Sequence, residues 1–185
     1  KGPLSAGIPG EPAGLVLIAK RYGRLPLQQS LAPAIRIARD GFKPDSRLRN
    51  AIAEEQKGLQ RWPASVAKYL PNGKPPVEDA IWRDPDQART LELIAAHGDD
   101  GFYRGETANK LVTAVRAAGG NWTLADLASY EAKERTPIIV NYRGYRIVTA
   151  PPPSSGGVAI AEILNILAGF DLSKMDQVQR VHYIV

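Results

Sequence analysis

Apolar residues recur every three or four positions over the first two thirds of the chain, which predicts a series of amphipathic helices. The segment PAGLVLIAKRYG, residues 12–23, has proline in its first turn and glycine at its end, and this order favours a helix start and a helix stop. In PLQQSLAPAIRIARDGF, residues 26–42, Leu27 and Leu31 begin an apolar stripe. Pro33 lies inside that stripe and indicates either a helix start or a kink, because proline has no N–H to donate.

The helical pattern continues after a turn. SRLRNAIAEEQKGLQRW, residues 46–62, is expected to be a helix with a serine cap. LPNGKPPVED, residues 70–79, is expected to be a loop, because Asn-Gly and Pro-Pro are strong turn signals.

More helices are expected after this loop. DPDQARTLELIAAHGDDGFYRG should begin with an acidic cap at Asp84 or Asp86, and ETANKLVTAVRAAGG should end at Gly119 and Gly120. TLADLASY is expected to be a short helix capped by Thr123.

The pattern then changes to an alternation of period two. TPIIVNYRGYRIVTA, residues 136–150, predicts two strands around Asn141 to Gly144, either as a hairpin or as a strand with a bulge. After PPPSSGG, the helix predicted over VAIAEILNILAGF is apolar nearly all round, so it should be buried on several sides. The final DQVQRVHYIV predicts another helix. The pattern as a whole indicates an α+β protein that is mostly helical with a β-hairpin.

Length and composition limit the number of domains and the class of protein. The 185 residues suit one ordinary domain, and 44% hydrophobic with 23% charged residues is the balance of a folded globular chain. KGPLSAGIPG lacks a starting methionine and a signal-type apolar run, and the last helix has no cap, so we expect both ends to be cuts through a longer protein. Apolar runs such as residues 15–19 are too short to span a membrane.

Charge and cysteine content exclude several classes of function. The absence of cysteine removes disulfides, thiolate catalysis and cysteine-based zinc sites. A net charge of +5 permits an acidic partner, but the basic residues are scattered among acidic ones. We therefore expect no nucleic-acid binding.

The histidines and acids have structural interpretations. His97 precedes a glycine at a predicted helix end, and His182 has no second histidine at metal-ligand spacing. The acidic pairs are Glu54–Glu55, Asp84/Asp86 and Asp99–Asp100. They lie at turns and helix starts, where acids act as caps or as solvated side chains. No metal site or cofactor is expected.

The junction PPPSSGG, residues 151–157, is the strongest chemical candidate. A nucleophile, an anion-binding helix N-terminus and a structural turn are all compatible with two serines between a strand and a helix. The prolines fix an extended entry, Ser154 or Ser155 could cap the helix, and Gly156 and Gly157 would let the backbone pass close to a neighbour. The pattern differs from the G-x-S-x-G of hydrolases, so the structural turn is favoured.

Three long segments resemble the large subunit of gamma-glutamyltranspeptidases and follow the order of that family. They are YRGYRIVTAPPPSSGGVAIAEILNILAGFDL, IPGEPAGLVLIAKRYGRLPLQQSLAPAIRIARDGF and GFYRGETANKLVTAVRAAGGNWTLADLASYEAKERTPI. The resemblance covers essentially the whole chain, with a small departure at PGEPAG.

The resemblance implies the αββα sandwich of N-terminal nucleophile hydrolases and an enzyme made as a self-cleaving precursor. In such enzymes the threonine that begins the small subunit attacks a gamma-glutamyl amide, as in glutathione, and the acyl group passes to water or an acceptor amine. The freed α-amine has a pKa near 8, so it can act as the base for its own hydroxyl.

The resemblance places the catalytic residues outside this sequence. The nucleophile would follow Val185 and the arginine that binds the substrate carboxylate would precede Lys1, so no catalytic residue is assigned here. Weak candidates for a site-wall motif are Ser154, Ser155, Gly156 and Gly157. The chain is expected to be a single incomplete domain, residues 1–185, from the middle of the large subunit and inactive alone.

The resemblance also implies the partners and the cellular location of the protein. Its expected partners are the small subunit of the same precursor and gamma-glutamyl compounds such as glutathione, and its expected location is periplasmic or secreted. Two alternatives stay open: a related amidase on the same scaffold, such as a cephalosporin acylase or a poly-gamma-glutamate-processing enzyme, and a non-catalytic helical interaction module.

Overall fold

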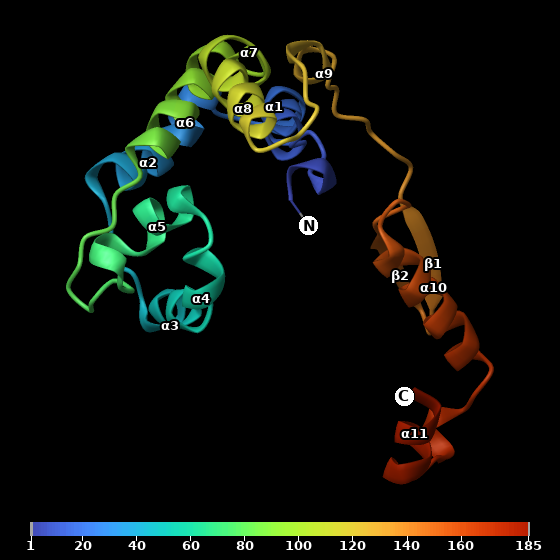
Figure 1. Ribbon diagram of the computed structural model, residues 1–185. Coiled ribbons are helices and arrows are strands. Elements are labelled where there is room, and N and C mark those ends of the chain that lie inside the picture. Colours follow the sequence, from blue (N-terminus) through green and yellow to red (C-terminus); the bar gives the residue numbers. More distant parts are fainter. Residues whose placement is uncertain (1, 185) are drawn as a thin grey trace. The chain divides into compact units, whose positions relative to one another are not determined.

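The computed structural model describes residues 2–184, which are mostly helical with a two-stranded antiparallel sheet (Figure 1). The chain divides into two compact units, Lys1–Ala132 and Lys133–Val185. Each unit is described by itself.

The first unit is built from helices joined by short turns. Their bounds are η1 (Pro3–Ser5), α1 (Glu11–Tyr22), α2 (Leu27–Asp40), α3 (Ser46–Glu54), α4 (Gln56–Leu59), α5 (Pro63–Tyr69), η2 (Pro71–Gly73), α6 (Pro85–His97), α7 (Asp100–Tyr103), α8 (Gly105–Ala117) and α9 (Leu124–Ala128). Helix α1 confirms the prediction from its proline start and glycine stop, and α6, α8 and the Thr123 cap of α9 are confirmed as well.

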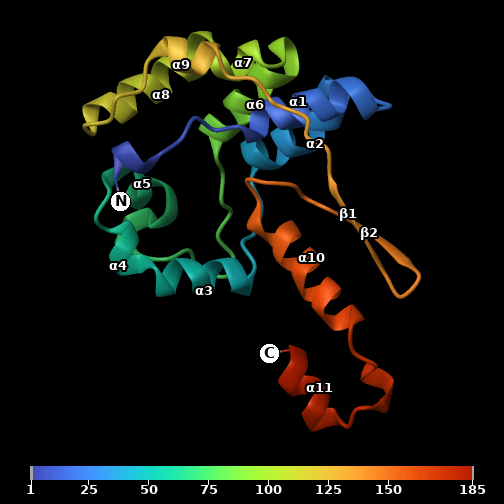
Figure 2. The ribbon, with the colours of Figure 1, turned by 90° about the vertical axis from the view of Figure 1, so that its right-hand side faces the viewer.

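Pro33 is not a helix start, which was one of the two alternatives that the sequence left open. Helix α2 begins at Leu27 and contains Pro33 in its interior. The Pro26 carbonyl accepts hydrogen bonds from the N–H groups of Gln29 and Ser30, which fixes the first turn upstream of Pro33. Helices α2 and α6 lie side by side (Figures 1 and 2), and this packing offsets the hydrogen bond that the proline cannot make.

The segment after α2 differs from its prediction in three ways. The cap of α3 is Asp45, whose Oδ1 accepts from the Leu48 N–H at 2.8 Å, so the expected serine cap was wrong. A charged acceptor makes a stronger hydrogen bond than a hydroxyl, which favours Asp45 over Ser46. The expected single helix is interrupted at Glu55, and α5 was not predicted.

A buried cluster joins the start of the chain to α7–α9. Its members are Ala13, Tyr103, Ala108, Val112, Trp122 and Leu127. The Tyr103 hydroxyl donates to the Pro9 carbonyl at 2.6 Å and accepts from the Ala13 N–H at 3.2 Å. Burial raises the pKa of Tyr103, which keeps this hydroxyl protonated and able to donate. Segments about 90 positions apart are thereby fixed to one another.

The second unit contains the predicted hairpin. Strands β1 (Ile138–Tyr142) and β2 (Tyr145–Thr149) pair antiparallel, with Tyr142 opposite Tyr145. The turn residues Arg143 and Gly144 both have positive φ, 48° and 86°, as a two-residue turn of type I′ requires. A hairpin rather than a bulged strand is therefore confirmed.

Three helical segments follow the hairpin: α10 (Ser155–Ala168), η3 (Leu172–Lys174) and α11 (Gln177–Ile184). Helix α10 contacts β1, and Gly157 and Leu167 are its buried positions. Ile163 and Ile166 remain 49% and 62% exposed, so the described residues leave much of its apolar surface uncovered. None of the described helices has the length and apolar character needed to cross a membrane.

Candidate functional site

The junction 151–157 connects the end of β2 to the start of α10. Pro151 begins a tight turn in which its carbonyl accepts from the Ser154 N–H at 3.2 Å. The peptide bond between Pro152 and Pro153 is cis. The extended entry expected from the prolines is therefore not found: the chain turns at Pro152 and Pro153 and leads directly into the first turn of α10.

The two glycines of the junction have different surroundings. A Cβ atom at Gly157 would collide with the carbonyl oxygen of Ala150 and lie 3.0 Å from Oγ1 of Thr149. A Cβ atom at Gly156 would have its nearest neighbour, Ser154 Oγ, at 3.9 Å. The expected close backbone approach is therefore found at Gly157, whereas the same expectation for Gly156 was wrong.

The serines occupy the helix start without capping it through their side chains. Ser154 is the N-cap residue by its backbone position, with φ −70° and ψ 122°, but its hydroxyl makes no capping hydrogen bond. Within the described residues, neither Ser154 nor Ser155 makes a hydrogen bond to a histidine or a carboxylate. An activated serine nucleophile needs such a base, so this geometry does not assemble one. The first N–H groups of α10 remain available to an acceptor.

The other candidates from the sequence lie apart from this junction. His97 ends α6 and is followed by Gly98 at φ 61°, which confirms its position at a helix C-terminus. His182 is exposed in α11. In the part of the chain that the structure describes, no group of three or more histidine, aspartate or glutamate side chains could hold a metal ion.

The acidic residues mostly act as caps or ion-pair partners. Asp84 caps α6 by accepting from the Gln87 N–H at 3.0 Å, which settles the choice between Asp84 and Asp86. Asp99 and Asp100 pair with Lys20 and Arg104 at 3.3 and 2.9 Å. Oδ1 of Asp99 is buried without a hydrogen-bond partner in the described chain.

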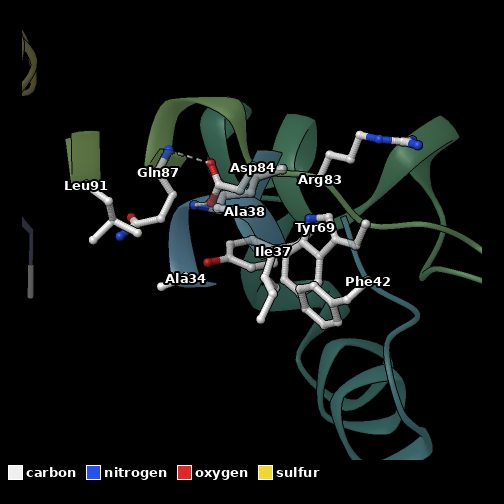
Figure 3. A pocket seen from close by; sticks show the side chains of 11 residues that line it. Ala34, Ile37, Ala38, Phe42, Tyr69, Arg83, Asp84, Gln87 and Leu91 are labelled. Carbon is white, nitrogen blue, oxygen red and sulfur yellow. Dashed lines mark hydrogen bonds and ion pairs between the residues drawn. The ribbon is translucent and has the colours of Figure 1, made fainter. Parts of the chain in front are cut away.

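A pocket beside α2 and α6 was not predicted. Its walls include the aromatic residues Phe42 and Tyr69 (Figure 3), together with Trp82. Lys68 and Asp84, which form an ion pair, also line it. Its lining residues come from segments up to 57 positions apart, between residues 34 and 91. Asp84 carried a sequence signal as a helix cap, and Ala34, Ala38 and Leu91 belong to apolar helix faces that the sequence predicts. No periodicity links the three aromatic positions.

Comparison with known proteins finds relatives along the whole length of the chain. The family model for Gamma-glutamyltranspeptidase matches residues 1–185. A glutathione hydrolase proenzyme from Pseudomonas sp. (strain A14) is 41% identical over 189 residues, which covers 100% of this chain and 32% of that protein. The chain thus spans about a third of the length of this relative.

Solved structures with the same fold include a gamma-glutamyltranspeptidase from Helicobacter pylori. It matches 100% of this chain and 54% of its own chain, with a TM-score of 0.94 and 33% identity. A cephalosporin acylase from Bacillus halodurans matches 98% of this chain and 34% of its own, with a TM-score of 0.89 and 35% identity. These matches and the helical content with one hairpin confirm the expected α+β fold class.

Proposed function

Because the chain belongs to the gamma-glutamyltranspeptidase family along its whole length, we propose that it is part of a gamma-glutamyl acyltransferase and hydrolase. The parent enzyme would cleave the gamma-glutamyl amide of glutathione and related compounds and transfer the acyl group to water or an acceptor amine. The observation that carries this proposal is the match over residues 1–185 together with the TM-score of 0.94 to a gamma-glutamyltranspeptidase structure.

The part played by this chain is structural. We place residues 1–185 in the middle of the large subunit, as one incomplete domain of the precursor. The catalytic threonine would lie outside the chain, and no serine of the 151–157 junction has a base beside it. The chain by itself is therefore expected to be inactive.

The junction 151–157 is proposed as a wall of the substrate site. Ser154, Ser155, Gly156 and Gly157 bring the start of α10 to the end of β2, where Gly157 packs against the Ala150 carbonyl. Free N–H groups at a helix start can donate hydrogen bonds to a carboxylate. We expect this segment to shape the site and to take no part in bond breaking.

The partner of this chain is proposed to be the remainder of the same precursor, including its small subunit. The uncovered apolar side chains of α10 support this assignment, because large exposed apolar surfaces mark contact sites. The name of the Pseudomonas relative, a proenzyme, also agrees with a processed precursor. A periplasmic or secreted location belongs to the same proposal.

A second candidate activity is hydrolysis of another amide on the same scaffold. It is favoured by an acylase ACY 1 proenzyme from Pseudomonas sp. (strain SE83), 40% identical over 174 residues, and by the cephalosporin acylase structure. The two activities differ in the acyl group that the site accepts.

The test is a pair of assays on the full-length, processed protein. We expect it to release the chromophore from a gamma-glutamyl anilide, and we expect the purified 185-residue chain to release none. Release from a glutaryl amide, which lacks the α-amino group, with none from the gamma-glutamyl anilide would establish the acylase alternative. Activity of the 185-residue chain alone would show that the catalytic group lies within it.

A further inference from the structure

We propose that the pocket beside α2 and α6 binds a small aromatic carboxylate, with its ring on the aromatic wall of Phe42, Tyr69 and Trp82 and its carboxylate at Lys68. The pocket has a volume of about 430 Å³, within the roughly 300–1,000 Å³ range typical of small-molecule sites. The site is independent of the catalytic activity proposed above, so each can fail without the other.

The aromatic wall is held in place by backbone contacts. Phe42 and Trp82 form an antiparallel bridge in which each N–H donates to the carbonyl of the other, at 3.1 and 2.9 Å. Asp84 donates its N–H to the Ala38 carbonyl at 2.8 Å and so fixes the next turn against α2. Gly41 makes the close approach possible, because a Cβ atom there would lie 2.9 Å from the Trp82 carbonyl oxygen. A wall fixed before binding reduces the ordering cost of binding.

The three rings form a continuous apolar surface. The Trp82 ring packs against both of the others, with its centroid 5.8 Å from that of Phe42 and 5.4 Å from that of Tyr69. The rings are tilted relative to one another, by 39° and 69°, so the ring of a ligand would pack against the face or edge of a single wall residue. Three apolar residues of α2 also line the pocket: Ala34, Ile37 and Ala38.

Polar groups gather at one side of this apolar surface. Lys68 pairs with Asp84 through Oδ2, and a lysine ammonium has three donors, so the pair leaves Lys68 able to donate to a second acceptor. Burial opposes the charge of Lys68, but the hydrogen bond and the charge of Asp84 outweigh it and raise its pKa, which keeps it cationic near neutral pH. The Tyr69 hydroxyl and the Gln87 amide also line the pocket, and neither side chain has a hydrogen-bond partner among the described residues.

The charges of the lining favour an anion over a cation. Three aromatic rings with a carboxylate can also hold a quaternary ammonium group. Here Lys68 and Arg83 line the pocket against the single carboxylate of Asp84, which leaves a positive balance. The rings also pack against one another, so they form one wall and do not surround a cation. Asp86 does not line the pocket, although its charge also acts on Lys68.

The experiment is isothermal titration of the full-length protein with 2-naphthoate. Saturable binding is expected, and the neutral isostere 2-naphthalenemethanol should bind at least tenfold more weakly. Ala34→Leu, an exposed helical position, should fill the pocket and weaken 2-naphthoate binding at least tenfold. The matched control Ala96→Leu adds the same volume at an exposed position of α6 outside the pocket and should leave binding unchanged.

A second variant keeps the proposal testable if Ala34→Leu does not fold. Lys68→Gln should reduce the preference for the acid over the alcohol to below threefold, while circular dichroism shows an unchanged fold. Absence of saturable binding would overturn the proposal. The same result is expected if another segment of the full-length protein fills the pocket, and the proposal is then wrong as well. Binding that Ala34→Leu leaves unchanged, or equal binding of acid and alcohol, would also overturn it.

Discussion

At the scale of single residues, neighbouring identical amino acids can have opposite roles. Gly156 and Gly157 are adjacent in the first turn of α10, yet only Gly157 touches the end of β2. The difference arises because successive helical positions are rotated by about 100°, so Cβ atoms at the two glycines would point in different directions. A glycine pair in a sequence therefore does not show which member is required.

The two glycines give a direct test of this geometry. Gly157→Ala is expected to lower the free energy of unfolding by about 1–3 kcal/mol, since its methyl group would collide with the Ala150 carbonyl. Gly156→Ala should be neutral or stabilising by up to about 1 kcal/mol, because alanine reduces the freedom of the unfolded chain. Urea unfolding of both variants measures the difference, and equal effects would contradict the packing at Gly157.

At the scale of elements, helix ends are specified by local hydrogen bonds. The capping box of α9 is reciprocal: the Thr123 hydroxyl accepts from the Asp126 N–H at 3.1 Å, and the Asp126 carboxylate accepts from the Thr123 N–H at 2.8 Å. The hydrogen bonds from the Thr123 side chain and backbone lower the pKa of Asp126. This contribution to stability is present above the ordinary pKa of an aspartate and is lost as the pH falls through the lowered value.

The capping box predicts a shift that carboxyl NMR titration can measure. In Thr123→Ala the hydroxyl no longer donates to the carboxylate, so the pKa of Asp126 should rise toward its ordinary value. Ser129→Ala is the matched control, because the Ser129 hydroxyl donates to the backbone carbonyl of Asp126 and not to its carboxylate. An unchanged Asp126 pKa in Thr123→Ala would show that the side-chain hydrogen bond does not cause the shift.

At the scale of the whole molecule, the described residues leave the apolar surface of α10 largely uncovered. Ile166 is 62% exposed in this chain, whereas its neighbour Leu167 is 7% exposed against the rest of the second unit. If the remainder of the precursor covers α10, as proposed, these two residues should respond differently to the presence of that remainder.

Alanine substitution of Ile166 and Leu167, in the full-length protein and in the 185-residue chain, tests whether the remainder of the precursor covers α10. Ile166→Ala should cost about 2–5 kcal/mol in the full-length protein, where we expect burial, and no more than about 0.5 kcal/mol in the 185-residue chain. Leu167→Ala should be destabilising in both forms. Urea unfolding provides the measurement, and a small effect of Ile166→Ala in the full-length protein would contradict the proposed contact.

The sequence by itself determined the features that depend on near neighbours. The helices of α1, α6 and α8, the Thr123 cap and the hairpin with its Arg143–Gly144 turn follow from periodicity and turn chemistry within a few residues. The long motifs also indicated the family. Local signals suffice for such elements because their hydrogen bonds join residues that are close along the chain.

Tertiary structure decided the features that depend on distant residues. Helix α2 passes through Pro33 because its packing against α6 compensates for the lost hydrogen bond. Gly157 is required, and Gly156 is not, because of where the Ala150 carbonyl lies. The aromatic wall joins Phe42 to Trp82 across 40 positions, through a bridge that no local pattern specifies. Contacts of this kind depend on how helices pack, and a one-dimensional pattern contains no distance between them.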